Sequence, residues 1–555
     1  MTGGKQLTAE VVIVGAGPAG LLLANYMGLY GVSTILIEKN PSTVSEPRAV
    51  SIDDESLRAV GEAGLYETVS GNLMPGYGSR YQSRSGSAFA RVMPTTREYG
   101  FPRRNAFHQD VYEAQLREKA QSYKCVKLLF EHHMDSFVQD EDGVTISVTA
   151  PTGKSMEVRA QYLSACDGAS SPVRTTLDIP LIGSTYAQQW LIIDILDSKD
   201  PYRHTRVFCD PTRPGISLPG PRRSRRFEFM LVPGEDPVAV LDDANIRALL
   251  RAHGPDEHAE VRRKCVYTFH ARIAERWKVG RILLHGDAAH LTPPFAGQGM
   301  NSGVRDIANS AWKLAAVIKG RLGAEILETY EEERKGHAWQ LIQMAMLMGK
   351  VMMPASPLRA ALTQAAFRLI RFIPPLSDYI TQMKYKPKPR FETGFFIRRG
   401  NEAGDVVGRM FPNAVVADPD HHEMRLDKVL GDGFVLLVCS DRPGTYYNAL
   451  PHDLLGANEL KVLCVTREET NFPNDERHAF VRDAADEAYG HLRQAGLEEC
   501  AVLLRPDRYV MAVIEAGMVA RDYDRVRAMI NATWGKGQRP ITNSAKDKMK
   551  ESVPA

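Results

Sequence analysis

One run of six residues near the amino terminus, Gly15-Ala-Gly-Pro-Ala-Gly20, constrains the fold more than any other part of this sequence. It follows the β-branched run Val11–Val14 and precedes residues 21–30, where apolar side chains recur at helical spacing. A second apolar run, Ser33–Ile37, comes next. Because a short β-branched run predicts a buried parallel strand, the order is strand, helix, strand. The amino-terminal region is therefore predicted to be a doubly wound α/β domain.

The three glycines of this run fit a turn that binds the pyrophosphate of a dinucleotide. Gly15 permits the tight turn, Gly17 lets the backbone approach the phosphates, and Gly20 lets the helix pack on the strand. The amino terminus of the helix then offers N–H groups and a favourable dipole to the anion. Glu38 follows the second strand, where an acidic side chain can accept hydrogen bonds from a ribose. The alternative is a glycine-rich turn that binds nothing.

Composition excludes several classes of partner and site. The 69 basic and 67 acidic residues give a formal charge of +2, which offers no electrostatic reason to expect nucleic acid or an anionic membrane. The seven cysteines form no C-x-x-C pair, so we expect free thiols in a reducing cytoplasm and no metal site. Residues 11–37 carry no charge, but their five glycines and one proline favour the nucleotide-binding unit over a membrane span.

A chain of 555 residues is too long for one core, and the patterns divide it into three domains. Strand-like runs such as Trp190–Ile195 and Arg226–Val232 predict an antiparallel sheet inserted into the first domain as a substrate domain. A long helical region is predicted from about Gly303 to Met353, and Pro374-Pro375 looks like a break. The predicted boundaries are 1–75, 105–180 and 281–395 for the nucleotide-binding domain with its helical extension, 76–104 and 181–280 for the substrate domain, and 396–555 for the last domain.

The last domain is predicted to be a small α/β fold. Its expected strands are Phe434–Cys439, Lys461–Val465 and Tyr509–Val513, and its expected helix is Asp475–Ala495.

Two further motifs indicate which dinucleotide is bound. Cys166-Asp-Gly-Ala-Ser-Ser-Pro-Val-Arg174 follows a predicted strand, Gln161–Ala165. Gly286-Asp-Ala-Ala-His290 follows another strand, at residues 281–286, and runs on through Pro293 to Gly297-Gln-Gly-Met-Asn301. Together with the first glycine turn, these motifs resemble the class A FAD-dependent aromatic hydroxylases in composition and order.

That resemblance implies non-covalent FAD, with NADH or NADPH and O2 as co-substrates. It makes Asp287, in the turn begun by Gly286, a ligand of a ribityl hydroxyl. Backbone N–H groups of Gly299, Met300 and Asn301 would then face the flavin O2 and N1, whose charge in the reduced flavin such donors stabilise. The resemblance also implies that Asp167 acts indirectly, by holding backbone near the phosphates. Arg48 would lie near the pyrophosphate of FAD, and Gln109 would contact FAD directly.

Several other stretches are similar to the 3-(3-hydroxyphenyl)propionate hydroxylases. They are Pro47–Glu55, Pro102–Phe107, Arg225–Met230 and Val266–Arg272. The carboxy-terminal domain resembles the thioredoxin-like tail of that branch. Because this chain has no C-x-x-C pair, its tail should be redox-inactive and serve packing or assembly. Whether the protein forms a homodimer is left open. The loop Pro294-Phe-Ala-Gly-Gln departs from the P-V-W-Q-G-Q form of some of these enzymes, so another phenol (resorcinol, polyketide or heteroaromatic) stays open.

The implied reaction adds one oxygen atom ortho to a phenol, through a C4a-hydroperoxyflavin that Pro293 and its neighbours keep dry. Candidate partners of the phenol are Asp53, Tyr267 and His270. Asp53 could instead cap a helix, and His270 could be purely structural.

Arg225 and Arg226 could hold a substrate carboxylate. As part of the basic run 222–226 they could equally lie on a solvated face. A non-catalytic FAD-binding scaffold is the rival interpretation from another class.

Overall fold

The computed structural model describes residues 6–398, 406–450, 460–468 and 478–533. The chain forms two compact units, which we describe separately. The first contains residues 1–311 and 331–391, and the second contains residues 312–330 and 392–555. Within the described ranges, no helix is long and apolar enough to cross a membrane.

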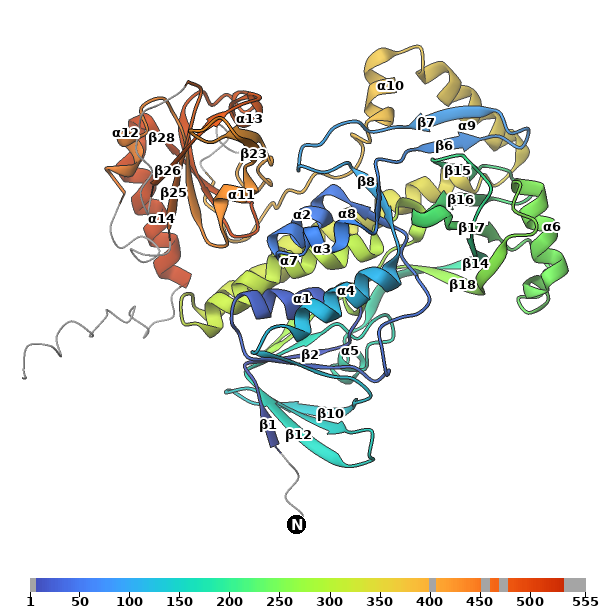
Figure 1. Ribbon diagram of the computed structural model, residues 1–555, viewed down its shortest axis with the longest axis horizontal. Coiled ribbons are helices and arrows are strands. Elements are labelled where there is room, and N and C mark those ends of the chain that lie inside the picture. The colour runs from blue at the N-terminus through green and yellow to red at the C-terminus, as the bar shows by residue number, and fades with distance from the viewer. Residues whose placement is uncertain (1–5, 399–405, 451–459, 469–477, 534–555) are drawn as a thin grey trace, which may run out of the picture. The chain divides into compact units, whose positions relative to one another are not determined.

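A six-stranded sheet forms the centre of the first unit (Figure 1). The predicted strand–helix–strand unit is present, and β2 pairs in parallel with β3 on one side and with β13 on the other. In sheet order the strands are β19 (Lys278–Val279), β20 (Ile282–Leu284), β13 (Tyr162–Ala165), β2 (Val11–Val14), β3 (Thr34–Ile37) and β9 (Val126–Leu129). The helices α1 (Pro18–Leu29) and α4 (Gln109–Gln121) pack together, and Asn25 Nδ2 of α1 donates to the Leu116 carbonyl of α4 at 2.9 Å.

Two smaller sheets flank this centre. One consists of β1 (Gln6–Thr8), β12 (Ser155–Ala160), β11 (Val144–Thr149) and β10 (His133–Gln139), and the other of β4 (Ser51–Asp53), β8 (Arg104–Phe107) and β5 (Leu73–Pro75). The sheet that contains β1 was not predicted from the sequence. In its strand β11, Val144, Ile146 and Val148 are buried and the residues between them are partly exposed. That alternation is the period-two signal of a half-buried strand. Short helices α2 (Asp54–Glu62), α3 (Tyr66–Ser70) and α5 (Pro172–Thr176) connect these parts.

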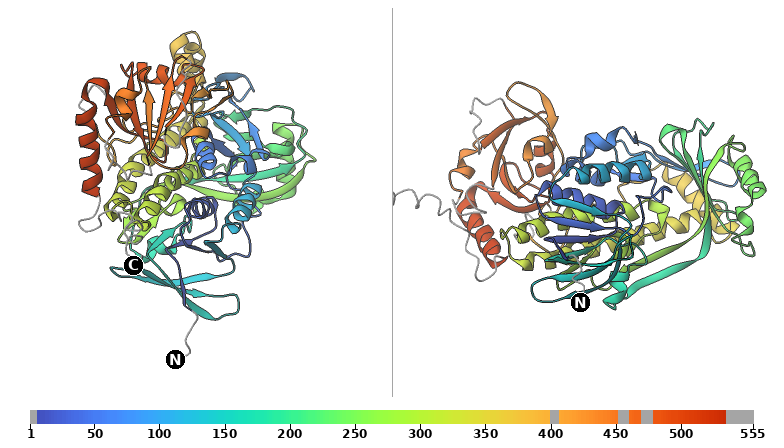
Figure 2. Two further views of the ribbon diagram at one scale, coloured as in Figure 1. Left: turned by 60° about the vertical axis from the view of Figure 1, so that its left-hand side comes forward. Right: turned by 60° about the horizontal axis from the view of Figure 1, so that its bottom comes forward.

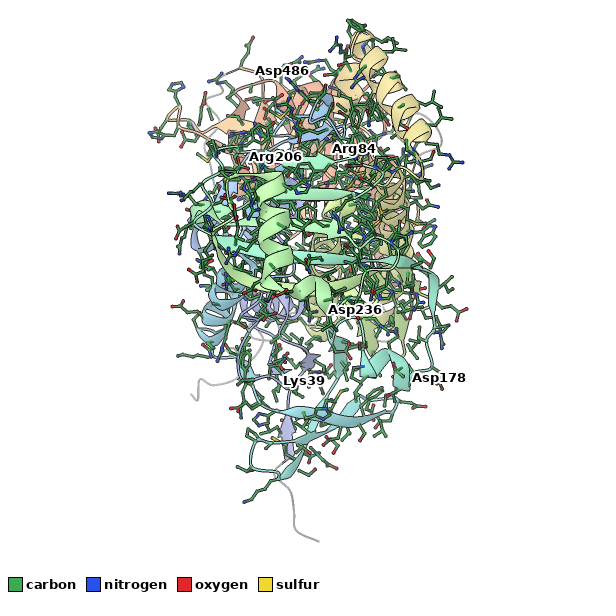
Figure 3. The ribbon with its side chains drawn as sticks, turned by 90° about the vertical axis from the view of Figure 1, so that its right-hand side faces the viewer. Lys39, Arg84, Asp178, Arg206, Asp236 and Asp486 are labelled. Atoms are coloured by element: carbon green, nitrogen blue, oxygen red, sulfur yellow. The ribbon has the colours of Figure 1, made fainter. Side chains whose placement is uncertain are left out.

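An eight-stranded sheet occupies the region predicted to be the substrate domain. Its order is β21 (His290–Leu291), β18 (Glu260–Ala274), β14 (Leu181–Leu196), β17 (Arg225–Met230), β16 (Gly215–Pro219), β15 (Thr205–Phe208), β6 (Ser79–Gln82) and β7 (Ala88–Val92). Helix α6 (Asp243–His253) lies over one face (Figure 3), where Ile246 and Leu250 pack on Phe227 and Phe229. The other face carries a second apolar cluster around Trp190. The sheet therefore has a covered face and a face that belongs to the site.

The predicted helical region is confirmed and begins slightly earlier than expected. Helix α7 covers Gly299–Ile318 and α8 covers Glu328–Met352, followed by α9 (Pro357–Ile370) and α10 (Pro374–Thr381). The predicted break at Pro374-Pro375 is instead the first turn of α10. Proline is tolerated there because the first N–H groups of a helix have no acceptor in the helix.

The second unit is built on a seven-stranded sheet, with α14 (Val519–Thr533) running beside its strands (Figure 2). The order is β23 (Glu423–Arg425), β22 (Val415–Ala417), β26 (His478–Asp483), β25 (Lys461–Thr466), β24 (Val435–Cys439), β27 (Cys500–Leu504) and β28 (Val510–Glu515). Helices α11 (Asp427–Leu430), α12 (Gly444–Tyr447) and α13 (Glu487–Arg493) complete it.

The three strands predicted for this domain are confirmed, but its predicted helix is mostly wrong. Residues 475–477 lie outside the described residues, 478–483 form β26, and only 487–493 are helical. Pairing with β25 and β22 places residues 478–483 inside the sheet and overrides their local helical pattern.

Candidate active site

The first glycine turn leaves open space in front of α1. A side chain on Gly15, which has φ of +102°, would lie 2.3 Å from the Cys166 carbonyl oxygen. One on Gly20 would lie 1.9 Å from the Gly15 oxygen. By contrast, a Cβ on Gly17 would meet no heavy atom within 4 Å. Gly15 and Gly20 are thus required by packing, whereas Gly17 borders a space from which a ligand can approach the amino terminus of α1.

Glu38 is positioned beside this turn. Its Oε2 accepts a hydrogen bond from the Ala16 N–H at 2.8 Å, and its Oε1 accepts from the backbone N–H of Asn40 at 2.9 Å. The carboxylate therefore fixes the turn as well as facing the place where a ribose would lie. Each carboxylate oxygen can accept a further bond, so the predicted ribose contact remains geometrically available.

Asp287 lies at a second close approach of backbone segments. Gly286 has φ of +58°, and its Cα lies against Gly303 of α7, where an added Cβ would come within 3.2 Å of it. The Asp287 side chain is exposed and accepts no hydrogen bond from the described residues. Its pKa is nevertheless raised, because protein around the carboxyl withdraws water, and the charges of His290 and Arg48 oppose that effect. The Asp287 carboxylate is therefore an acceptor that the described residues leave unbonded, next to the place where Gly286 meets Ala19 and Gly303. We call the region around this contact, between the amino termini of α1 and α7, the recess.

The amino terminus of α7 faces the same recess. Its first helical hydrogen bond runs from the Ser302 N–H to the Gln298 carbonyl, so the N–H groups of Gly299, Met300 and Asn301 have no acceptor within the helix. The Asn301 side chain is buried, where it accepts from the Asp53 N–H at 3.0 Å and donates to the Gly297 carbonyl at 2.7 Å. Asn301 thus fixes the loop, and its backbone supplies a donor.

Asp306, which sequence reasoning missed, fixes the turn that presents Asp287. Its Oδ2 accepts from the Gly286 N–H at 3.1 Å and from His290 Nε2 at 2.7 Å, and its Oδ1 accepts from Arg334 Nε at 3.0 Å. All of these groups are buried. The available signal was the charged pair Arg305-Asp306 inside a mostly apolar helix.

Asp167 and Ser171 shape the turn after β13. Asp167 Oδ2 accepts from the Val173 N–H at 3.1 Å, and Ser171 Oγ accepts from the Arg174 N–H at 3.0 Å, so Ser171 caps α5. The other Asp167 oxygen, Oδ1, is buried with no hydrogen-bond partner among the described residues. Burial raises the pKa of Asp167, and its bonds to Ser171 and Val173 oppose the rise. This arrangement suits the predicted indirect role of holding backbone.

Arg226 anchors the loop that carries Arg48, and this corrects its predicted substrate role. Its guanidinium pairs with Asp194 and also donates to the carbonyls of Pro47 and Arg48, each at 2.5 Å. Gln109 holds the same loop from the other side, since its Oε1 accepts from the Arg48 N–H at 2.7 Å. Arg226 is buried and donates four hydrogen bonds to protein partners, so it is poorly placed to bind a substrate carboxylate. The Arg48 side chain remains exposed.

Arg225 is likewise unavailable to a substrate. It is buried, donates to Ser198 Oγ at 3.2 Å and Ser217 Oγ at 3.0 Å, and donates to the Tyr202 carbonyl at 2.7 Å. Neither of the readings made from the sequence, substrate clamp or solvated face, describes it. Its role is to hold the segment between β14 and β15.

Asp53 caps α2 and lies in a buried ion cluster, which favours the structural reading made from the sequence. Its Oδ1 accepts from the Ser56 N–H at 3.0 Å, and its Oδ2 pairs with Arg305 and, at 3.0 Å, with Lys386. Burial alone would raise the pKa of Asp53, but these two cations outweigh it and hold the pKa below its usual range. A carboxylate 3% exposed and bonded on both oxygens is poorly placed to accept the proton of a phenol.

Tyr267 and His270, the other two candidate partners of the phenol, point to opposite faces of β18. Side chains alternate along a strand, so Tyr267 shares a face with Phe269, and their rings are 5.9 Å apart. His270 lies on the other face, where Nδ1 is 3.0 Å from Thr185 Oγ1. Tyr267 is 41% exposed, and burial and the charge of Asp287 raise its pKa while Arg48 lowers it. Tyr267 thus lies within reach of the charges of Asp287 and Arg48, and His270 is on the opposite face of the strand.

An aromatic wall stands beside the loop that begins at Pro293, which is itself buried. The Phe295 ring packs edge-on against Tyr186, Trp190 and Phe269, with centroids 5.6, 5.7 and 5.6 Å apart. Such a wall excludes water from what lies behind it.

Comparison with known proteins decides the family. The FAD binding domain family matches residues 8–345, and the HcaD C-terminal domain family matches residues 408–529. A 3-(3-hydroxy-phenyl)propionate/3-hydroxycinnamic acid hydroxylase from Klebsiella pneumoniae is 37% identical over 516 residues, which is 92% of each chain. One of the same name from Burkholderia cenocepacia is 37% identical over 525 residues, which is 94% of this chain and 96% of the relative.

This chain belongs to the FAD-dependent aromatic hydroxylases. The solved structure of the flavin-dependent monooxygenase PieE with FAD and substrate has a TM-score of 0.78 at 23% identity, and covers 95% of this chain and 99% of its own. Aklavinone-11 hydroxylase with FAD and aklavinone has a TM-score of 0.74 at 23% identity, and covers 96% of this chain and all of its own. These two likenesses show that the hydroxylase shares their fold.

The residues of the recess fit FAD. The open space at Gly17 and the amino terminus of α1 suit the pyrophosphate, and the unbonded Asp287 carboxylate suits the ribityl hydroxyls. The N–H groups that begin α7 suit the pyrimidine edge of the flavin. We therefore take FAD as the cofactor of this hydroxylase, with NAD(P)H as co-substrate.

Replacing Asp287 by Ala should weaken FAD binding about tenfold or more. The change leaves ribityl hydroxyls without an acceptor in the recess, which costs roughly 1–3 kcal/mol. Quenching of flavin fluorescence on titration of the apoprotein measures the dissociation constant. Asp142→Ala, on an exposed hairpin, is the matched control and should leave affinity unchanged. Equal affinity in both variants would show that Asp287 does not bind FAD.

Replacing Asp54 by Asn should stabilise the protein above pH 6 and not near pH 4. Burial raises the pKa of Asp54 to about 6, and Lys386 opposes the rise only in part. Because the folded pKa exceeds the unfolded one, the wild type loses stability as pH rises from about 4 to 6. The Asp54→Asn variant does not undergo this loss, so above pH 6 it should be more stable than the wild type by roughly 1–3 kcal/mol.

Melting temperatures of the FAD-loaded proteins at pH 4 and pH 8 check this prediction. Asp53→Asn is the matched control, and it should lower the melting temperature at pH 8, because Arg305 and Lys386 lose a paired carboxylate. A gain from Asp54→Asn that is the same at both pH values would contradict the assigned titration.

Proposed function

We propose that this hydroxylase places one oxygen atom ortho to the hydroxyl of a phenol that resembles 3-(3-hydroxyphenyl)propionate. The observation that carries the proposal is the aromatic wall of Phe295, Trp190, Phe269 and Tyr186 beside the loop that leads to Gly299. When bound, FAD supplies the reductive activation of O2 by which one oxygen atom reaches the ring. The names of the 37% identical relatives support the choice of substrate class.

The protein's own residues position FAD and exclude bulk water from the reacting ring. We infer that Gly15, Gly17 and Glu38 position the adenosine half of FAD, while Asp287 and the start of α7 position the flavin half. Arg48 lies where its charge reaches Asp287, which supports the predicted role of Arg48 near the pyrophosphate. Pro293 and the aromatic wall keep bulk water from the reacting ring.

Tyr267 is the partner we infer for the substrate hydroxyl. It lies within reach of the Asp287 charge and is 41% exposed, and its own hydroxyl makes no hydrogen bond to any described residue. A neutral tyrosine hydroxyl can both donate a hydrogen bond to a phenol and accept one from it, and the raised pKa of Tyr267 favours this neutral form. Asp53 is already bonded on both oxygens, and His270 lies on the far face, so neither is proposed for this role.

The remaining inferences concern the whole chain. We infer the three domain boundaries given above, a thioredoxin-like fold for the carboxy-terminal unit and a cytoplasmic location, and a homodimer is left open. The central strands of this unit are β26, β25, β24 and β27. The first three run parallel to one another, and β27 runs antiparallel to β24. This mixed arrangement supports the thioredoxin-like assignment. The departure at Phe295 from the loop form of some relatives keeps other phenols as the alternative substrates.

The proposal is tested by offering the purified enzyme a panel of phenols. Yellow protein should release FAD intact on denaturation, and a 3-substituted phenol should stimulate NAD(P)H oxidation and gain 16 mass units, the mass of one oxygen atom. Resorcinol and a polyketide phenol serve as comparison substrates. Hydroxylation of none of them by FAD-loaded enzyme would refute the proposed function.

Tyr267→Phe should uncouple the reaction while FAD stays bound. The phenol then loses its hydrogen-bond partner, and such assistance is typically worth roughly 10²–10⁴-fold in the chemical step. The ratio of hydroxylated product to NAD(P)H consumed should fall, and hydrogen peroxide should rise. His270→Phe, on the opposite face of the same strand, is the control and should keep the wild-type ratio. A fully coupled Tyr267→Phe enzyme would remove Tyr267 from the mechanism.

A further inference from the structure

The helices α9 and α10 expose an apolar surface. Of the thirteen large apolar side chains that are exposed among the described residues, six lie within residues 358–376. They belong to α9, to α10 and to the turn that joins these helices, and we call them the outer patch: Leu358, Leu362, Leu369, Phe372, Ile373 and Leu376. Single exposed apolar residues are ordinary, whereas a contiguous group of them marks a surface that binds a partner.

The part of the outer patch on α9 forms one stripe along the helix. Leu358, Leu362 and Leu369, together with the exposed Ala365, follow one another at spacings of four, three and four residues. Such spacing places side chains on one face of a helix. The stripe therefore runs along the whole of α9 and ends at the turn to α10.

The opposite side of α9 anchors the helix to the eight-stranded sheet, beside β7 (Figure 1). The Phe367 ring is 5.8 Å from the ring of Phe89 on β7. Phe367 lies nine residues after Leu358, which at about 100° per residue places it on the opposite side of the helix. Helix α10 is fixed as well, because the Met93 N–H donates to the carbonyl of its last residue, Thr381, at 2.8 Å. Both helices are thus held in place by contacts that do not involve the outer patch.

Arginines border the outer patch on both sides. Arg359 follows Leu358 in the sequence, and Arg368 precedes Leu369. At about 100° per residue, these two arginines therefore flank the apolar stripe from opposite directions. Arg371, in the turn to α10, lies 4.6 Å from the centroid of the adjacent aromatic ring of the patch. All three arginines are exposed, and none forms an ion pair with any described residue.

The charge around the outer patch is strongly positive. From residue 347 to residue 384 the chain has five basic residues and one acidic residue, Asp378. Asp378 pairs with Lys384 at 2.6 Å, so the other four basic residues have no acidic partner within this segment. The formal charge of +2 for the whole chain conceals this local excess. The occupant that fits the outer patch is therefore both apolar and negatively charged.

We propose that α9 and α10 bind the surface of an anionic lipid bilayer. In this arrangement the outer patch contacts the acyl chains, and the three arginines lie at the level of the lipid phosphates. An apolar helix face bordered by basic side chains is typical of helices that lie in the plane of a bilayer interface. A second copy of the chain fits less well, because a two-fold contact through this patch would bring the arginines of both copies together. The proposal does not depend on the reaction that the enzyme catalyses.

Co-sedimentation of the FAD-loaded, full-length protein with lipid vesicles tests the proposal. Vesicles of equal parts phosphatidylglycerol and phosphatidylcholine should bind the protein in about 0.1 M salt, and vesicles of phosphatidylcholine alone should bind it at least roughly tenfold more weakly. Arg359→Gln combined with Arg368→Gln should weaken binding to the anionic vesicles roughly tenfold or more, since each basic residue at such a surface contributes about fivefold. Phe372→Ser should also weaken it roughly tenfold, because an aromatic ring no longer enters the acyl chains.

Lys124→Gln combined with Lys154→Gln is the matched control, since it removes the same charge from exposed loops elsewhere in the chain. This control should bind the anionic vesicles as the wild type does, and all variants should keep the wild-type melting temperature and FAD content. Equal weakening in the arginine pair and the lysine pair would overturn the proposal, as would absence of wild-type binding to the anionic vesicles. A wild-type dimer that binds no vesicle and that Phe372→Ser dissociates would show instead that the outer patch joins two copies of the chain.

Discussion

The close approach of Gly286 to Gly303 and Ala19 is the constraint on which the cofactor site depends. At this point a turn after β20 meets α1 and α7 with almost no side chain between them. The contact brings together the amino terminus of α1, the Asp287 carboxylate and the first N–H groups of α7. Asp306 then fixes the turn from beneath through the Gly286 N–H and His290. A larger residue at either glycine would push these three binding elements apart.

A second set of contacts joins the eight-stranded sheet to the cofactor loop. Arg226 on β17 and Arg263 on β18, the two strands on either side of β14, both donate to the Pro47 carbonyl. Arg262 donates to the Ser45 carbonyl. The loop that carries Arg48 is therefore held by side chains from the region that also forms the aromatic wall. Through these bonds, the position of the sheet and the position of the Arg48 loop are coupled.

The proposed cofactor site could be predicted from the sequence because its elements depend on local backbone geometry. A turn that needs glycine, or an acid that follows a strand, leaves its mark within a few residues, as at Gly15 and Asp287. The long-range ion pairs of Arg226 and Asp53 were not predictable in this way. Arg226 finds its partners at Asp194 and Pro47, and Asp53 meets Lys386 across 333 residues. Only the fold decides whether such a charge reaches a substrate or is neutralised by the protein.

Glu38 combines two roles that a substitution cannot separate. At this place in a dinucleotide-binding fold, an acid accepts hydrogen bonds from a ribose. Here the same carboxylate also accepts the Ala16 N–H and so holds the glycine turn closed. Exchange of Glu38 for a neutral or basic residue would remove the proposed ribose acceptor and loosen the turn together. A loss of FAD affinity in such a variant would therefore combine both effects, and only a substitute bond for Ala16 would separate them.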